Sequence, residues 1–149
     1  MKKWCIPILF FLLTSSLFAQ KAKSSLQLNV GYGTKIENVG LGVTYNWVLS
    51  KKSEFSPSVV FFPEKDGVSI KEINFDYHRL KKIGEQITWF PIIGFSIAEW
   101  GDTSFGLNVG LGARYSLNEK INVGAFYKYA MMTKSASQSV PMLTVGYKF

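Results

Sequence analysis

His78, the only histidine of the chain, lies among ionisable side chains that could support acid–base chemistry. Glu72, Asp76 and His78 share one phase of alternation in the segment KEINFDYHR, and the cations Arg114 and Lys128 follow further along the chain. A histidine that is oriented by a carboxylate can activate a serine hydroxyl as a nucleophile. Whether these side chains meet depends on the elements that carry them.

Apolar residues recur at every second position over most of the chain, which is the spacing of a β-strand with two unlike faces. The run FGLNVGLGARYSL at 105–117 shows this pattern clearly. Pro57 and Pro91 interrupt two of the runs, and each proline predicts a bulge or a missing ladder hydrogen bond. Together the runs predict eight strands, at 25–34, 38–48, 54–63, 68–80, 86–97, 104–117, 120–132 and 139–149.

Three features favour strands that cross a membrane. All eight predicted strands are ten to fourteen residues long, whereas soluble strands have about five or six and a tilted membrane strand needs about 9–11. Ten of the thirteen glycines share the phase opposite the large apolar residues, as suits a narrow polar lumen. The outward aromatics form two predicted belts, a periplasmic one (Tyr45, Trp47, Tyr77, Trp89, Tyr115, Tyr147, Phe149) and an outer one (Tyr32, Phe61, Phe105, Tyr127, Tyr129).

The beginning of the chain predicts export. Two lysines precede an apolar run over residues 4–18, and Ala19 supplies a small residue for cleavage. This layout predicts a signal peptide over residues 1–19, and the run is shorter than the ~20 residues of a spanning helix. Residues 20–149 are then one exported domain. Because Cys5 leaves with the signal, that domain is expected to have no disulfide, no thiolate metal site and no cysteine nucleophile.

Charge and motifs exclude other classes of function. The net charge is +7 for the whole chain. A basic protein can bind nucleic acid, but predicted export and the lack of lysine clusters interleaved with aromatics exclude that partner. No metal-ligand spacing and no phosphate-binding glycine loop occurs, so no cofactor is expected.

The last nine residues, PMLTVGYKF, alternate strictly and end on an aromatic. In this the chain resembles the small eight-stranded outer-membrane β-barrel proteins, of the kind formed by the OmpA transmembrane domain and by OmpX. The resemblance covers residues 20–149 and rests on pattern; Pro141 departs from it. In that family the insertion machinery reads the C-terminal ending, which is matched here by Leu143, Val145, Tyr147 and Phe149.

The resemblance implies a closed antiparallel up-and-down barrel in the bacterial outer membrane. Its expected partners are outer-membrane lipids, lipopolysaccharide and the barrel-assembly machinery. All backbone groups must pair internally in a bilayer, which a closed barrel achieves. A soluble lipocalin-like barrel is the alternative fold.

An eight-stranded barrel has an interior that its own side chains fill. Glu72, Asp76, His78, Arg114 and Lys128 all fall in the predicted inward phase. Buried charges need partners, so we expect Glu72 to face Lys128, and Asp76 with His78 to face Arg114. This polar network predicts a closed plug; a narrow gated ion path, sensitive to neutralising Arg114, is the alternative.

Some barrels of the resembled kind deacylate or acylate lipid A near the outer leaflet, using a serine and a histidine. His78 is expected near the periplasmic end, away from the serines of its own strand. A non-enzymatic structural or interaction role is therefore favoured, and a lipid A-modifying enzyme is the alternative.

The predicted outer loops are short, which disfavours an adhesin or a phage receptor. A larger outer-membrane complex is one expected partner, with the small outward residues Ala113 and Ala125 as a candidate lateral contact. The periplasmic rim, on which Glu54 is placed, is basic and suits anionic head groups. Trp100 in an outer loop is expected to be an exposed contact or an interfacial anchor.

Overall fold

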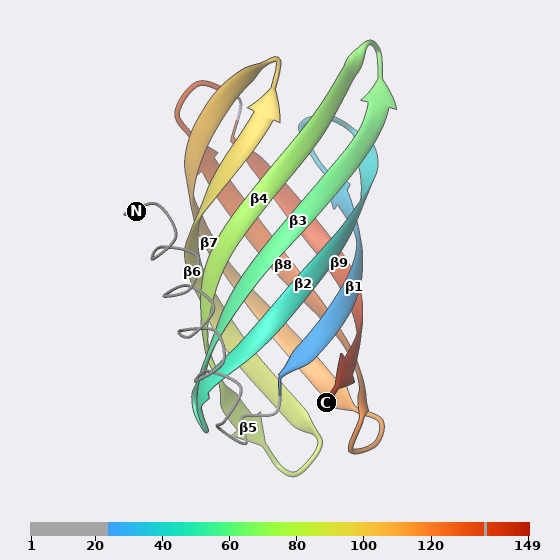
Figure 1. Ribbon diagram of the computed structural model, residues 1–149, viewed down its shortest axis with the longest axis vertical. Coiled ribbons are helices and arrows are strands. Elements are labelled where there is room, and N and C mark those ends of the chain that lie inside the picture. The colour runs from blue at the N-terminus through green and yellow to red at the C-terminus, as the bar shows by residue number, and fades with distance from the viewer. Residues whose placement is uncertain (1–23, 136) are drawn as a thin grey trace, which may run out of the picture.

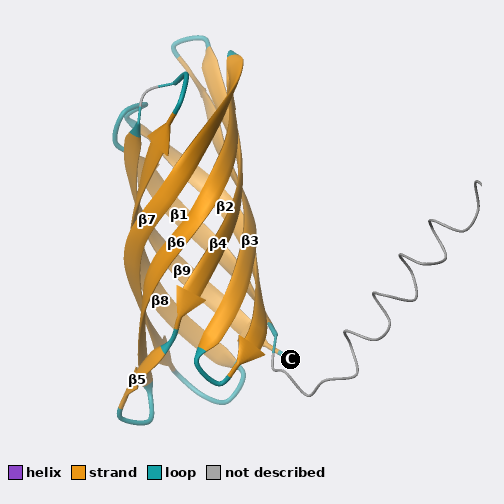
Figure 2. Cartoon of the chain, turned by 90° about the vertical axis from the view of Figure 1, so that its left-hand side faces the viewer, coloured by secondary structure: helices purple, strands orange, loops and turns teal. Residues whose placement is uncertain are grey.

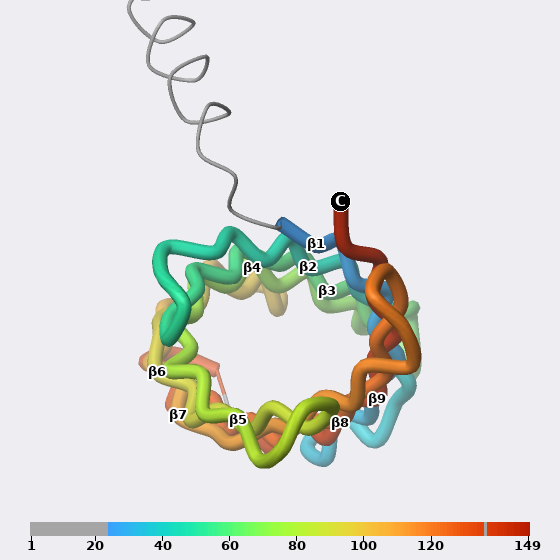
Figure 3. The backbone as a smooth tube through the Cα atoms, turned by 90° about the horizontal axis from the view of Figure 1, so that it is seen from below, coloured from blue at the N-terminus to red at the C-terminus, as the bar shows by residue number. Residues whose placement is uncertain are grey.

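The computed structural model describes residues 24–135 and 137–149, so the predicted signal peptide over 1–19 lies outside the described residues. Figure 1 shows long strands that wind around one axis, and Figure 3 shows that they close into a ring. The strands are β1 (Ser25–Gly33), β2 (Asn38–Ser50), β3 (Ser53–Lys65), β4 (Val68–Arg79), β5 (Lys81–Ile83), β6 (Ile87–Trp100), β7 (Asp102–Ser116), β8 (Ile121–Met132) and β9 (Gln138–Lys148).

The chain forms a closed antiparallel barrel of eight membrane-length strands in meander order. β4 and β5 count as one of the eight, because both pair with β6 and only Leu80 separates them. β1 pairs with both β2 and β9, which closes the sheet. Short loops join the strands at both ends (Figure 2). The predicted fold is confirmed, with strand boundaries within three residues of those expected.

The prolines of the wall each leave one ladder incomplete. Pro57 pairs with Phe75 of β4, whereas the β2–β3 ladder is interrupted at this level. Pro91 pairs with Leu111 of β7, whereas the ladder from β6 to β4 and β5 is interrupted at its level, between the pairs Ile92–His78 and Trp89–Lys81. Because proline has no backbone N–H, it cannot complete the ladder on both sides. The irregularity predicted at both prolines is confirmed.

The register of the ladders sets the tilt of the strands. Following the paired outward residues once around the wall from Trp89 leads back to β6 at Glu99, ten residues further along. A stagger of this size requires the strands to tilt against the barrel axis, typically by about 35–45°. The path runs through Trp89, Ala113, Ala125, Leu143, Val30, Leu41, Phe61, Lys71 and Glu99, and we call it the outward row.

The two faces of the sheet differ in the manner of a membrane barrel. Large apolar side chains stand exposed around the outer wall, among them Leu28 (64%), Ile93 (63%) and Leu143 (68%). Asparagine, serine and threonine side chains fill much of the buried inner face. A soluble lipocalin-like barrel would bury its apolar face, whereas a lipid-facing wall has to expose it.

Glycines on the inner face make room for large lumen side chains. A Cβ added at Gly40 would lie 2.5 Å from the ring of Phe62, and one added at Gly112 would lie 2.5 Å from the ring of Phe90. Both distances are far below van der Waals contact. In the narrow lumen, the aromatic rings of neighbouring strands therefore occupy the space that a Cβ would take at these two inward glycines.

Replacing Gly40 by alanine tests this fit. Gly40→Ala is expected to lower the free energy of unfolding by about 1–3 kcal/mol, the usual cost of overpacking. Urea titration in detergent micelles measures it, with Phe62→Leu alone as the control. The double variant Gly40→Ala/Phe62→Leu should regain part of the loss, since the shorter side chain leaves space for the new methyl. Strict additivity of the two effects would contradict the proposed contact.

Candidate functional site in the lumen and on the outer wall

Glu54, His78 and Arg114 meet inside the barrel toward the end that carries the C-terminus. Arg114 donates to both carboxylate oxygens of Glu54, from Nη1 to Oε2 at 3.1 Å and from Nη2 to Oε1. Nδ1 of His78 lies 2.8 Å from Oε1 of the same carboxylate, which is only 2% exposed. The ring of Phe90 stacks on His78 and lies 4.4 Å from the guanidinium carbon of Arg114. We call these four residues the lower cluster.

Glu54 is the member of this cluster that the sequence analysis assigned wrongly, to the periplasmic rim. The register pairs Glu54 directly with His78, and its phase on β3 is the inward phase of Val60 and Phe62. That shared phase was the signal that could have placed it inside. Arg114 consequently pairs with Glu54, and the expected contact between Arg114 and Asp76 is wrong.

Lys128 forms the centre of a second ionic cluster higher in the lumen. Its Nζ lies 3.3 Å from Oε1 of Glu72 and 3.6 Å from Oδ2 of Asp76, and it donates to Oδ1 of Asn74 at 2.5 Å. Asn108 donates to both Asn74 and Asp76, at 2.9 and 2.8 Å. Lys128 is 2% exposed, so its charge is balanced by these side chains and not by bulk water. We call these five residues the upper cluster.

An apolar cluster closes the lumen beyond the upper cluster. It consists of Val60, Phe62, Ile70, Val140 and Met142. Ile36, from the turn after β1, and Trp100, the last residue of β6, pack against it. Trp100 was expected to be an exposed contact or an interfacial anchor, but the apolar lumen residues beneath it hold it partly buried over the opening.

Little free space remains near the lower cluster. The cavity there has a volume of about 10 Å³, and its lining includes Gln27, Thr44, Ser56 and His78. This is roughly the smallest volume that holds one water molecule. A hydrated ion does not fit at this level of the described lumen.

Ser56, His78 and Glu54 form a set that resembles a catalytic triad in composition. Oγ of Ser56 lies 3.2 Å from Nδ1 of His78, the same nitrogen that Glu54 contacts. A working triad needs its nucleophile and its acid on opposite ring nitrogens, so that the base can pass a proton. Here both partners share one nitrogen, Arg114 occupies the carboxylate, and the set is buried. This geometry stabilises the lumen and does not activate Ser56.

Ser56 was not among the predicted site residues, because only the serines of the strand that carries His78 were weighed as nucleophiles. Ser56 comes from β3, two residues after Glu54 and in the same inward phase. Its hydroxyl also donates to Oδ1 of Asn46 at 2.8 Å. In the part of the chain that the structure describes, no group of three or more His, Cys, Asp or Glu residues is arranged to hold a metal ion.

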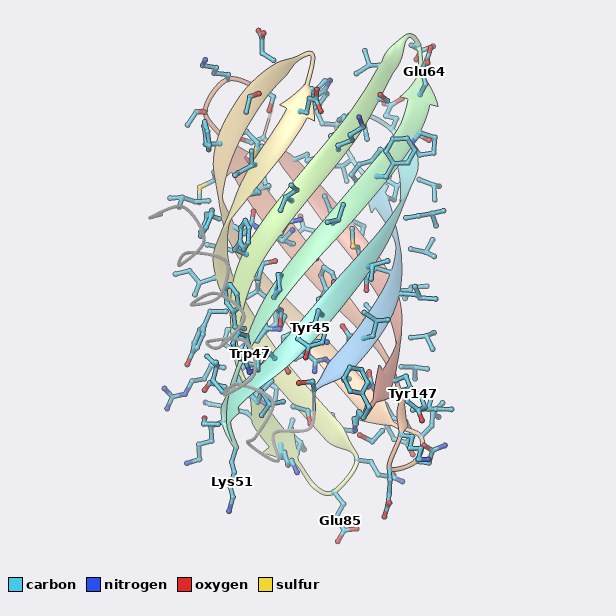
Figure 4. The ribbon with its side chains drawn as sticks, viewed as in Figure 1. Tyr45, Trp47, Lys51, Glu64, Glu85 and Tyr147 are labelled. Carbon is cyan, nitrogen blue, oxygen red and sulfur yellow. The ribbon has the colours of Figure 1, made fainter. Side chains whose placement is uncertain are left out.

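Aromatic side chains gather near the two ends of the outer wall. Tyr45, Trp47 and Tyr147 project outward near the C-terminal end, and Lys51 and Glu85 lie beyond them at the rim (Figure 4). We call the aromatic residues at this end the lower aromatic belt; they are Tyr45, Trp47, Trp89, Tyr115 and Tyr147. The residues of the predicted outer belt are also exposed, namely Tyr32, Phe61, Phe105, Tyr127 and Tyr129.

The C-terminal strand presents the residues of the predicted assembly signal to the outside. Leu143, Val145, Tyr147 and Phe149 are all exposed on the wall. The ring of Phe149 lies 6.2 Å from that of Tyr45. The outer face of β9 therefore displays a continuous row of apolar side chains.

Ala113 and Ala125 are paired across β7 and β8 in the outward row. Larger side chains surround them, so the wall has a shallow groove of about 810 Å³ at this place. We call it the wall groove; its lining includes Ile83, Trp89, Leu111, Ala113, Ala125, Tyr127 and Leu143.

These features define the class of the protein: a small membrane-type β-barrel with a filled lumen and an apolar wall. The chain has the fold of the small eight-stranded outer-membrane barrels. The N-terminal β-barrel domain of Pseudomonas aeruginosa OprF superposes with a TM-score of 0.74 at 14% identity, over 86% of this chain and 98% of that one.

Two further solved structures show the same likeness. The Yersinia pestis outer membrane protein Ail gives a TM-score of 0.63 at 14% identity, over 87% of this chain and 100% of that one. The outer membrane enzyme PagL gives 0.56 at 12% identity, over 84% of this chain and 98% of that one. Comparison of the sequence with protein-family models and with curated proteins finds no match. At these identities the likeness shows the fold alone.

Removing the charge of Arg114 tests the lower cluster. Arg114→Met should lower the free energy of unfolding by about 3–5 kcal/mol, because it leaves Glu54 as an uncompensated buried charge. The midpoint of urea unfolding in micelles, followed by tryptophan fluorescence, measures the loss. Adding Glu54→Gln should restore much of it.

Lys71→Met is the matched control for Arg114→Met. It breaks the exposed Lys71–Glu99 pair, whose 4.0 Å contact lies on the outer wall. An exposed pair contributes about 0–1 kcal/mol, so the control should change stability little. Equal losses in the two variants would contradict the assignment of the lower cluster as a buried, mutually dependent set.

Proposed function

We propose that this protein is a non-enzymatic outer-membrane β-barrel with a structural or interaction role. One observation supports the proposal: the ionisable lumen residues are paired with one another beneath a cluster of apolar side chains, the arrangement expected of a closed plug. What remains accessible is the outer wall and the two rims. The likeness to outer-membrane barrels supports this placement.

The proposed placement puts the C-terminal end at the periplasmic face. Residues 1–19 would direct export, and Leu143, Val145, Tyr147 and Phe149 would then be read by the barrel-assembly machinery. Phospholipids and lipopolysaccharide would surround the apolar wall between its aromatic belts.

A closed lumen predicts an electrically silent barrel. In planar bilayers the unaltered protein should give no steady conductance steps, while a large porin in the same bilayers confirms that steps are detectable. The alternative of a narrow gated pore predicts the opposite result. Steps that change in size when Arg114 is replaced by methionine would establish that alternative.

The wall groove supports a more specific role as an accessory subunit of a larger outer-membrane complex. Ala113 and Ala125 leave the backbone of β7 and β8 close to the surface, where a partner's side chains could pack. Close approach at small residues is a common way for membrane-spanning elements to associate, because lipid supplies no hydrophobic driving force between them.

The test is extraction of the tagged protein in mild detergent, followed by mass spectrometry of what co-purifies. A stoichiometric larger partner is expected, and Ala113→Leu/Ala125→Leu should remove it by filling the groove. Val43→Leu/Val59→Leu, another outward pair joined across two strands, is the matched control and should retain the partner.

Purification of the barrel alone would overturn the subunit role. Mass spectra of lipid A from cells with and without the protein would then separate an autonomous structural barrel from a lipid A-modifying enzyme. The structural barrel leaves the lipid A masses unchanged, whereas the enzyme shifts them.

A further inference from the structure

Two cations of the outer wall have no counterion within the described residues. Arg79 at the end of β4 and Lys81 in β5 are exposed and share the outward phase. Neither forms an ion pair with any part of the chain that the structure describes. Lys71, the outward cation near the opposite end of β4, does have a partner, since its Nζ lies 4.0 Å from Glu99.

Arg79 and Lys81 lie at the depth of the lower aromatic belt. Lys81 pairs with Trp89, and its Nζ is 5.0 Å from the centre of the indole ring. Arg79 pairs with Ser53, next to the turn that joins β2 and β3. Tryptophan is enriched where lipid head groups begin, so both cations lie at head-group depth. Long basic side chains extend there toward phosphate groups.

The acidic side chains of this region are not in place to neutralise the two cations. Glu54 is buried and already holds Arg114. Glu85 lies in the turn beyond β5, at the rim of the barrel (Figure 4). Among the described residues, neither Glu54 nor Glu85 therefore forms an ion pair with Arg79 or Lys81, and both cations are free to bind an anion from outside.

The wall groove begins beside these cations. Ile83 and Trp89 line its lower end, and both are apolar residues of the outward face. Lys81 is paired with Trp89, so the apolar surface of the groove lies next to a cation that has no ion pair. Such a surface matches a molecule with a hydrocarbon chain and a negative head.

We propose that Arg79 and Lys81 bind the phosphate of an anionic phospholipid in the periplasmic leaflet, with an acyl chain against Ile83 and Trp89. The inference deepens the proposed function and rests on its outer-membrane placement. A net negative head group is preferred over a zwitterionic one, because the positive charge of the latter offsets its phosphate. Each basic residue near an anionic surface strengthens binding about fivefold.

Fluorescence quenching of Trp89 by brominated lipids tests the site. Trp47→Phe and Trp100→Phe leave Trp89 as the only tryptophan of residues 20–149. The protein is reconstituted in phosphatidylcholine vesicles that contain a rising fraction of dibrominated phosphatidylglycerol or dibrominated phosphatidylcholine. Half-maximal quenching is expected at a severalfold lower fraction of the brominated phosphatidylglycerol.

Charge variants test whether Arg79 and Lys81 cause the preference for phosphatidylglycerol over phosphatidylcholine. Arg79→Gln/Lys81→Gln should make the two lipids quench equally, whereas Arg79→Lys/Lys81→Arg keeps both charges and should keep the preference. Lys51→Gln/Lys52→Gln removes the same charge from the neighbouring turn and is the matched control.

Each outcome decides a different point. Equal quenching by the two lipids in the unaltered protein would overturn the lipid site. The site would also be overturned if Lys51→Gln/Lys52→Gln abolished the preference for phosphatidylglycerol as fully as Arg79→Gln/Lys81→Gln does, because that result would indicate a diffuse basic rim. Absence of quenching by either lipid would instead contradict membrane insertion, and with it the proposed function.

Discussion

The pairing of β1 with β9 is the contact on which the rest of the structure depends. In hydrocarbon no water can satisfy an open sheet edge, so a β-structure there has to close on itself. Closure with a stagger of ten residues tilts every strand and joins the two rims by one outward row. The tilt lets strands of nine to fifteen residues line a wall with an aromatic belt near each end.

Closure with so few strands also narrows the lumen, and the inner face reflects that constraint. Glycines opposite Phe62 and Phe90 provide the space that these rings need. Glu54 with Arg114, and Lys128 with Glu72 and Asp76, bury charge at low cost because each finds an opposite charge across the bore. On the outer wall, by contrast, Arg79 and Lys81 form no ion pair with any described residue.

The fold could be predicted from the sequence because lipid imposes a period of two that few other environments sustain over whole strands. Contacts across the lumen could not be predicted equally well. The stagger decides which residues share a level, so Asp76 meets Lys128 and not Arg114. The inward phase of Glu54 and Ser56 on β3 could have predicted that both side chains enter the lumen. Glu54 was instead assigned to the rim because it lies close to the turn before β3. Trp100 packs against the lumen residues because it ends β6 in the inward phase of Ser96 and Ala98, whereas the predicted strand stopped at residue 97.

The backbone N–H of Phe149 donates to the carbonyl of Ser24 at 3.0 Å, and β1 begins its ladder with β9 at Ser25 and Lys148. The seam of the barrel thus joins the first and last strands, which have the largest sequence separation of any paired strands. Every other ladder joins strands that follow one another along the chain, and such local pairings carry a smaller loop-closure cost. Closing the seam therefore carries the largest loop-closure cost of the barrel's ladders. An open seam would leave two unpaired strand edges, the kind of surface that pairs with a neighbouring copy.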